Sequence, residues 1–330
     1  MAKEQVSYSG AYNPPTKVPI PYLPPQWTPY AELLRIHKPA GILYVYFPYL
    51  FGSLFAASIK TSMPSFQSLI ITNFQLFILA LIIRGAGCTW NDIVDCELDR
   101  HVARCRIRPI ARGALSPNQG YIFIAFQYLF LLFIATIAMP QTLKYLVPII
   151  LTTTFYPYAK RITNYAQVVL GVALSLGILA GSSMMGVNPL SMGLRSKSSG
   201  ALFAFAISNV VWTVIYDTIY AFQDIEDDER AGVKAVSVRH KAHMRPLLFS
   251  LSVIQVALLV MTGVLIEANL VFFVGVACTA VLLFIMTRNV DLEDPKSCGW
   301  WFKYGSLLVG GSLILSLQGE YFARLGDFGV

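Results

Sequence analysis

Residues 74–100 read FQLFILALIIRGAGCTWNDIVDCELDR and pass from an apolar run directly into a cluster of acids. Residues 216–234, YDTIYAFQDIEDDERAGVK, repeat this change at the end of another apolar segment. Carboxylates at membrane depth are costly and therefore rare without a function. Two such clusters predict a site for divalent cations, because Mg²⁺ prefers carboxylate oxygens and commonly shares a phosphate with the protein.

The composition of the chain indicates a membrane protein. It has 330 residues, of which 55% are hydrophobic and 13% are charged, and its mean hydropathy is +0.58. Soluble domains carry about 25% charged residues, so this chain has too little polar surface to cover a soluble globule. The sequence therefore predicts an all-α, polytopic protein that contacts the lipid bilayer.

Apolar segments recur at about the ~20 residues that a helix needs to cross a bilayer. They predict nine transmembrane helices, at about 40–58, 68–90, 120–139, 143–159, 165–186, 201–223, 246–266, 270–287 and 300–319. The fourth and eighth segments are short. We expect residues 31–330 to form one transmembrane domain. Residues 1–30 are rich in proline, which predicts a disordered tail without a regular helix.

The net charge of +7 does not indicate nucleic-acid binding, because the basic residues lie in loops between apolar segments. Eighteen lysines and arginines fall on the side of the N-terminus and five on the opposite side. The positive-inside rule then predicts that the N-terminus and both acidic clusters face the cytosol. The tail has neither the apolar core of a secretory signal nor the arginines of a mitochondrial transit peptide. This favours an ER-type endomembrane over the mitochondrial inner membrane.

The first acidic cluster can direct several oxygens to one point. Asn91, Asp95 and Asp99 are spaced four residues apart, so they lie along one stripe of a helix. Asp92 points away from this stripe. The cysteines and histidines of the chain show no grouping typical of metal ligands, so the prediction of a metal site rests on the carboxylates.

The second acidic cluster has the same property if its segment is helical. Asp217, Asp224 and Asp228 then fall within about 40° of one another at about 100° per residue. Asp227 points elsewhere. A solvated helix end would explain one such cluster, but it does not explain two on the same membrane face. We therefore interpret both clusters as parts of one metal site.

Basic residues follow the first cluster. Arg104, Arg108 and Arg112 recur every four residues, although Pro109 interrupts a simple helix there, and Lys160 provides another positive charge. Guanidinium groups bind phosphate through paired hydrogen bonds. Acids that hold Mg²⁺ beside bases that hold an anion are typical of a diphosphate site.

These motifs resemble those of the UbiA family of intramembrane aromatic prenyltransferases. The resemblance lies in NDIVDCELDRHVARCRIRPIARG (91–113), YDTIYAFQDIEDDERAGVK (216–234), YPYAKRIT (156–163) and RIHKPAG (35–41). It spans most of residues 31–320. Cys105 departs from the family pattern, in which many members carry threonine after the arginine.

The resemblance implies nine helices around a central cavity with a cap on the cytosolic side. It implies two Mg²⁺ ions bridged by an isoprenyl diphosphate and held by Asn91, Asp95, Asp99, Asp224 and Asp228. It further implies that Arg108 and Lys160 contact the diphosphate. Asp217, Tyr220, Arg104 and Arg112 would lie nearer a phenolic acid acceptor or support the loop, with Asp217 a candidate base or acceptor-orienting group. The ring of Tyr220, one turn past Asp217, is placed where its π-face could stabilise a carbocation.

Within the family, the chain is most similar to fungal meroterpenoid enzymes, which transfer farnesyl to polyketide-derived phenolic acids. The alternative is a 4-hydroxybenzoate polyprenyltransferase of ubiquinone biosynthesis. An alternative of another class is a transporter with an acidic cation site. A transporter would place acids near the midplane on broken helices, whereas these acids lie at helix ends. A soluble-type isoprenyl chain synthase would lack the apolar spans.

Overall fold

The computed structural model describes residues 23–60, 62–102, 104–188, 190–193 and 196–327. Within these ranges the chain forms helices and no strand. Most of the expected tail, residues 1–22, lies outside the described residues. The first helix, α1 (Thr28–Leu33), begins inside the segment expected to lack a helix. Pro29 falls in its first turn, where proline is tolerated because no intrahelical hydrogen bond is lost.

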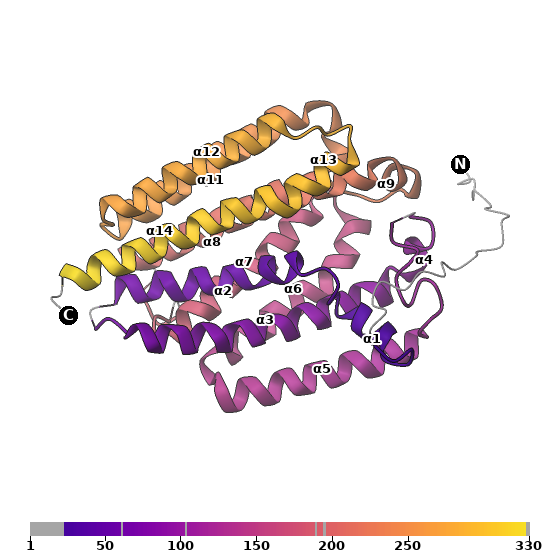
Figure 1. Cartoon of the computed structure of the whole chain (residues 1–330), viewed down its shortest axis with the longest axis horizontal. Coiled ribbons are helices and arrows are strands. Elements are labelled where there is room, and N and C mark those ends of the chain that lie inside the picture. Colours follow the sequence, from indigo (N-terminus) through magenta and orange to yellow (C-terminus); the bar gives the residue numbers. More distant parts are fainter. Residues whose placement is uncertain (1–22, 61, 103, 189, 194–195, 328–330) are drawn as a thin grey trace.

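The long helices form one bundle (Figure 1). They are α2 (Ala40–Ile59), α3 (Phe66–Val94), α5 (Pro117–Ala138), α6 (Leu143–Ile162), α7 (Ala166–Met184), α8 (Lys197–Ala221), α11 (Met244–Leu265), α12 (Leu270–Asn289) and α14 (Ser306–Asp327). Seven helices in the described chain are long and apolar enough to cross a membrane, and α6 and α14 are not among them. A multi-span bundle is therefore confirmed, while nine crossings stay a prediction.

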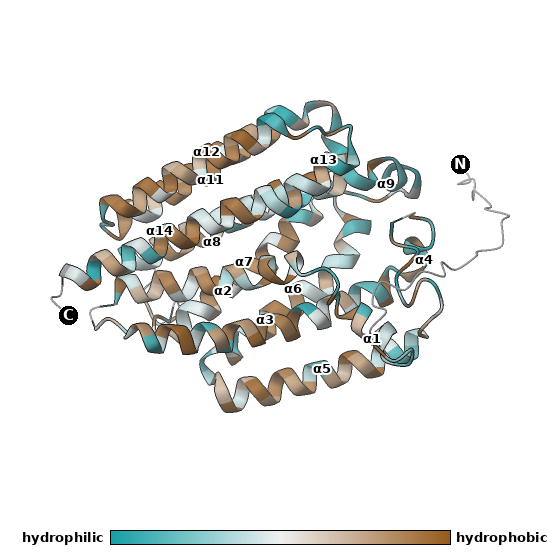
Figure 2. Ribbon diagram, viewed as in Figure 1, coloured by the Kyte–Doolittle hydropathy of each residue, from teal (hydrophilic) through white to brown (hydrophobic). Residues whose placement is uncertain are grey.

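The short helices gather mainly at one end of the bundle, where hydrophilic residues are concentrated (Figure 2). They are α4 (Cys96–Asp99), η2 (Phe222–Asp224), α9 (Ile225–Ala231), α10 (Val236–Arg239), η3 (Lys241–His243), α13 (Pro295–Trp300) and the π-helical turn η4 (Trp301–Gly305). A further turn, η1 (Pro140–Thr142), links α5 to α6. Both acidic motifs lie at the hydrophilic end, because α3 leads into α4 and α8 leads into η2 and α9.

Helices α2 and α7 approach each other closely at two glycines. A Cβ atom on Gly52 would lie 2.0 Å from the carbonyl oxygen of Ile178, and one on Gly181 would lie 2.1 Å from that of Tyr49. Small residues let helix backbones approach in membrane proteins, where close packing replaces the hydrophobic effect as the driving force. This contact fixes α2 in the centre of the bundle, beside the site described below.

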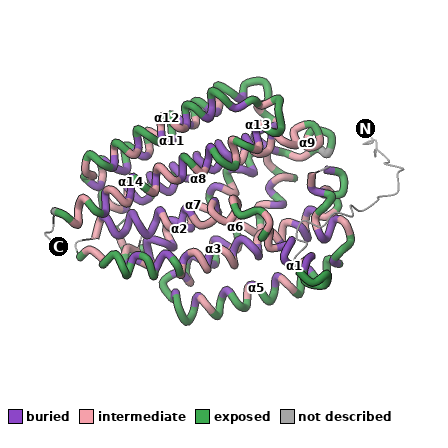
Figure 3. Tube along the Cα trace, viewed as in Figure 1, coloured by how far each residue is buried: buried purple, intermediate pink, exposed green. Residues whose placement is uncertain are grey.

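The outer surface of α5 is apolar. Ile122, Phe126, Leu129, Phe133 and Ile137 recur every three or four residues and are exposed, Ile122 to 72% and Ile137 to 68%. Figure 3 shows α5 exposed along much of its length, and Figure 2 shows that its residues are hydrophobic. An exposed apolar face of this length is what a lipid-facing helix requires.

An ion pair with a buried carboxylate ties α14 to the turn between α11 and α12. Glu320 is fully buried, and its Oε1 accepts a 2.5 Å hydrogen bond from Nε of Arg324. Its Oε2 accepts a 2.8 Å bond from the backbone N–H of Asn269. Arg324 also donates to the carbonyl oxygen of Ile266 at 2.6 Å. The Glu320 carboxylate therefore accepts hydrogen bonds from both the Arg324 guanidinium and the backbone N–H at the start of α12.

Replacing Glu320 with alanine is expected to destabilise the protein by about 3 kcal/mol, because Arg324 loses its carboxylate partner and the Asn269 N–H loses its acceptor. Glu320→Gln keeps an oxygen for the Asn269 N–H and should give an intermediate loss. Thermal unfolding of the purified protein in detergent measures both changes. A wild-type melting midpoint for Glu320→Ala would show that the pair does not support the fold.

Candidate active site

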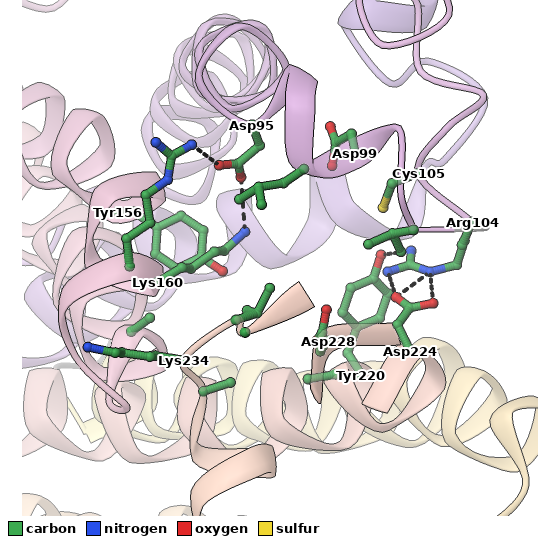
Figure 4. A pocket seen from close by; sticks show the side chains of 18 of the residues that line it. Asp95, Asp99, Arg104, Cys105, Tyr156, Lys160, Tyr220, Asp224, Asp228 and Lys234 are labelled. Carbon is green, nitrogen blue, oxygen red and sulfur yellow. Dashed lines mark hydrogen bonds and ion pairs between the residues drawn. The ribbon is translucent and has the colours of Figure 1, made fainter. Parts of the chain in front are cut away.

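A cavity of about 490 Å³ opens at the hydrophilic end of the bundle. Its walls come from the α3–α4 junction, the loop that follows α4, the ends of α6 and α8, and the segment after α9. Figure 4 shows Asp95 and Asp99 on one side of this cavity and Asp224 and Asp228 on the other. Two acidic clusters more than a hundred residues apart in the chain therefore face one space.

In the first cluster, each carboxylate has a cationic partner. Asp95 lies 3.5 Å from Nζ of Lys160 and 3.4 Å from Nη2 of Arg161. Asp99 accepts a 2.6 Å hydrogen bond from Nη1 of Arg108. Burial raises the pKa of Asp99 to about 6, against the lowering effect of Arg108. An ionised Asp99 thus depends on a nearby cation, which Arg108 supplies here.

The expected single stripe of Asn91, Asp95 and Asp99 is divided between two cavities. Helix α3 ends at Val94, and Asp95 interrupts the helix with φ −93° and ψ 5° before α4 begins. Asn91 lines a neighbouring cavity instead, where its buried Oδ1 has no hydrogen-bond partner among the described residues. The stripe holds for one continuous helix, whereas the structure breaks the helix at Asp95.

The second cluster is not one helix either. Helix α8 ends at Ala221, and the 3₁₀ turn η2 separates it from α9. A 3₁₀ turn advances by about three residues per turn, so the positions calculated for an α-helix do not apply. Asp217, Asp224 and Asp228 nevertheless all line the cavity. Asp227 lies elsewhere, as expected, in a separate groove and 3.8 Å from Arg230.

Arg104 connects the two motifs. Its Nε donates to both carboxylate oxygens of Asp224, at 3.0 and 2.8 Å. Its Nη1 donates to the hydroxyl of Tyr220, and its guanidinium carbon lies 4.5 Å from the centre of that ring. Asp217, one turn before Tyr220, lines the same cavity. Its side chain has no hydrogen bond or ion pair with the part of the chain that the structure describes.

Arg112 does not line this cavity or its neighbour. It pairs with the buried Glu32 of α1 at 2.5 Å and donates to the carbonyl oxygen of Ile107. Of the two roles that the sequence left open for Arg112, these contacts correspond to support of the loop.

Two arginines that the sequence did not assign to the site lie at its edge. Arg35 binds the fully buried Asp92 at 2.5 Å and adopts a left-handed backbone with φ 56°. Arg84 donates to the carbonyl oxygens of Leu34, Arg35 and Lys38, at 3.0 to 3.3 Å. An arginine inside an apolar segment was the signal that could have identified Arg84.

A second cavity of about 280 Å³ adjoins the first. The two share Arg108, Tyr156, Lys160 and Tyr220. Away from these residues the second cavity is mostly apolar, and it is lined by Val45, Tyr49, Ile83, Gly87, Cys88, Ile149, Thr153, Pro157, Leu170, Ala173 and Leu174. Arg35, Arg84 and Asn91 complete its wall. Together the cavities form a charged chamber that continues into an apolar one.

The donor set of the charged chamber suits Mg²⁺. Asp95 and Asp99 from one motif and Asp224 and Asp228 from the other would supply the carboxylate oxygens that Mg²⁺ prefers. Within the described residues no three histidine, cysteine, aspartate or glutamate side chains converge as one metal cluster. The carboxylates instead pair with Lys160, Arg108 and Arg104. The chemistry of the residues fits the ion, and the further ligands would come from a diphosphate.

A sequence profile of the UbiA prenyltransferase family matches residues 45–308. The prenyltransferase ascA of Acremonium egyptiacum is 36% identical over 244 residues, which cover 73% of this chain and 70% of ascA. The mitochondrial 4-hydroxybenzoate polyprenyltransferase of Saccharomyces cerevisiae is 33% identical over 314 residues, 93% of this chain and 80% of that protein. A UbiA homologue from Archaeoglobus fulgidus bound to GPP and Mg²⁺ shares the fold, with a TM-score of 0.64 at 18% identity over 88% of this chain and 99% of that one.

Proposed function

The chain belongs to the UbiA prenyltransferase family and is an aromatic prenyltransferase, and we propose that it transfers a farnesyl group from farnesyl diphosphate to a ring carbon of a phenolic acid. We further propose that the acceptor is polyketide-derived and that the product is a meroterpenoid. The observation that carries the proposal is the pair of acidic motifs facing one charged chamber that continues into an apolar one.

The charged chamber suits the diphosphate of the donor. Arg108 and Lys160 line both cavities, so they lie where a charged head would meet an apolar tail. Mg²⁺ held by Asp95, Asp99, Asp224 and Asp228, with Asn91 at the edge, would neutralise charge on the departing diphosphate. Arg108 and Lys160 would bind the remaining oxygens through charge-assisted hydrogen bonds.

The adjoining cavity suits the prenyl chain and the aromatic acid. Its apolar wall excludes water, which would otherwise quench an allylic cation. Arg84 lines this cavity and is 9% exposed, and among the described residues its guanidinium binds backbone carbonyls and no carboxylate. A buried cation without a counterion favours a ligand that carries an acid group, which supports a phenolic acid as the acceptor.

The reaction follows from these placements. The C–O bond of the donor breaks, and its electron pair leaves with the diphosphate, which Arg108 and Lys160 stabilise electrostatically. An electron-rich ring carbon of the phenol attacks the allylic cation and forms the new C–C bond. The ring then loses the proton from that carbon to restore aromaticity. Asp217 lines the chamber and makes no hydrogen bond or ion pair with the described residues, so it is the residue proposed to orient the acceptor or take this proton.

The orientation in the membrane is also a proposal. Nine crossings would place the N-terminus and the C-terminus on opposite sides, and α1 and the end of α14 do lie at opposite ends of the bundle (Figure 1). The excess of basic residues at the motif end supports a cytosolic active site. We propose an ER-type endomembrane and one transmembrane domain that begins near residue 31.

Product mass analysis tests the proposed function. The purified protein is supplied with geranyl, farnesyl or geranylgeranyl diphosphate and a panel of phenolic acids that includes 4-hydroxybenzoate, with and without Mg²⁺. We expect a Mg²⁺-dependent product one farnesyl group heavier than a polyketide-type acid. If 4-hydroxybenzoate is the only acid of the panel that gives a product, the chain is a 4-hydroxybenzoate polyprenyltransferase of ubiquinone biosynthesis instead. No Mg²⁺-dependent release of diphosphate with any acceptor would exclude the proposed reaction.

A further inference from the structure

A short π-helical turn separates α13 from α14, the last two helices of the chain. The turn η4 lies between α13 and α14, and its N–H to C=O bond runs from Ser306 to Trp301. Gly305 leaves room for it, because a Cβ there would lie 2.6 Å from the Trp301 ring. Such turns widen a helix locally, and they frequently occur at functional sites.

The hydroxyl of Tyr44 forms a hydrogen bond to the backbone of this turn. Tyr44, on α2, donates at 2.5 Å to the carbonyl oxygen of Phe302 and lies 3.2 Å from that of Lys303. Tyr44 is only 4% exposed, so the bond is shielded from water. Its ring also lies 5.0 Å from the Phe302 ring, centre to centre. The position of Phe302 is therefore determined by both a hydrogen bond and a ring contact.

Phe302 packs against Tyr220, a residue of the active-site wall. The two ring centres are 4.4 Å apart, and Tyr216 adds a third ring at 6.0 Å from Phe302. Arg104 lies over the Tyr220 ring and donates to the Tyr220 hydroxyl. The Tyr220 side chain is thus held between the Phe302 ring and a guanidinium group, which restricts how it can turn.

The same guanidinium group holds Asp224. Arg104 bonds both carboxylate oxygens of Asp224 through its Nε. A continuous series of contacts therefore runs from Tyr44 through Phe302, Tyr220 and Arg104 to Asp224. Its first two members line neither of the two active-site cavities. Such contacts matter for catalysis, because a displacement of a catalytic group by about 1 Å can lower the reaction rate about a hundredfold.

We propose that Phe302 and Tyr44 are positioning residues, which set the Tyr220 side chain so that its hydroxyl meets Arg104 and Arg104 in turn holds Asp224 in place. This rests on the proposed function for the part that Tyr220 and Asp224 have in turnover. The positioning itself is a property of the folded chain, so it is tested with and without catalysis.

The catalytic test is a double-mutant cycle. Tyr44→Phe removes the hydroxyl alone, and we expect it to lower kcat about tenfold through lost positioning. The Tyr220→Phe variant has no Tyr220 hydroxyl to position. In this variant, adding Tyr44→Phe should lower kcat by less than about twofold. Tyr46→Phe is the matched control, because Tyr46 on the same helix donates at 3.2 Å to the carbonyl oxygen of Asn73, away from the site. It should leave kcat within about twofold of wild type.

The second test needs no turnover. Backbone hydrogen exchange is measured in residues 217–230 of the purified protein, with Tyr44→Phe and with Phe302→Leu, which keeps an apolar side chain but removes the ring. We expect exchange there to speed up about tenfold in both variants and to stay at the wild-type rate in Tyr46→Phe.

The outcomes separate the two proposals. The positioning role is overturned if Tyr44→Phe lowers kcat by the same factor in the wild-type and Tyr220→Phe proteins. It is also overturned if hydrogen exchange in residues 217–230 stays at the wild-type rate in both Tyr44→Phe and Phe302→Leu. A wild-type protein inactive with every donor and acceptor overturns the proposed function instead, and the exchange rates alone then decide the positioning role.

Discussion

Alanine in place of Asp224 is expected to abolish prenyl transfer while the helical bundle stays folded. Asp224 faces the charged chamber from the second motif and is held by Arg104. The change removes a proposed Mg²⁺ ligand and releases Arg104, so charge on the departing diphosphate is no longer balanced. We expect kcat/KM to fall by more than about a thousandfold. Asp95→Ala, from the opposite wall, should give the same result.

Two further variants separate charge from structure. Asp224→Asn keeps the side-chain volume and one acceptor oxygen for Arg104, and it should still be inactive if the negative charge is required. Glu226→Ala is the matched control, because Glu226 is exposed two residues away and pairs with Arg230. Product formation by mass spectrometry and thermal unfolding are measured for all of them. Near-normal turnover in Asp224→Ala or Asp95→Ala would exclude the two-motif metal site.

Arg108→Ala is expected to weaken binding of the prenyl diphosphate far more than binding of the aromatic acceptor. Arg108 lines both cavities, donates to Asp99 at 2.6 Å and lies 3.5 Å from the buried Asp92. Its removal deletes a proposed phosphate contact and leaves Asp99 without its cationic partner. A lost charge-assisted contact at a buried site costs about 2–5 kcal/mol, so KM for the donor should rise by about thirtyfold or more.

The decisive measurement compares the change in KM for the prenyl donor with the change in KM for the aromatic acceptor. KM for the acceptor should change less than about threefold, because the acceptor is proposed to contact Asp217 and Arg84 rather than Arg108. Arg106→Ala, an exposed position in the same loop, is the control for general loss of positive charge. If KM for the donor is unchanged in Arg108→Ala, the diphosphate does not bind where these cavities meet.

The motifs themselves were readable from the sequence because their chemistry is local. Acids at the ends of apolar segments are costly in a bilayer, and that alone indicated a polar site at one membrane face. The resemblance to the UbiA family, stated from four short motifs, is confirmed by the profile match over residues 45–308. Arg104, Arg108 and Lys160 line the chamber, whereas Arg112, which belongs to the same charge pattern, does not.

The positions of single side chains were less predictable, because they depend on where each helix ends. A stripe calculation assumes an unbroken helix, but α3 stops before Asp95 and the 3₁₀ turn η2 follows α8. Asn91 lines the apolar cavity instead of the charged chamber, and Arg112 binds Glu32 of α1. Nothing local in the sequence marks Glu32 as its partner, since eighty residues separate them.

The amino-acid sequence alone determined that this chain is a bundle of membrane helices with acids and bases collected at one end, because hydropathy and charge act on each segment independently. Only the tertiary structure decided which oxygens and cations share a cavity, that Arg104 bridges the two motifs, and that Phe302 lies behind Tyr220. Those contacts join residues far apart in the chain, and their geometry follows from how the helices break and pack against one another.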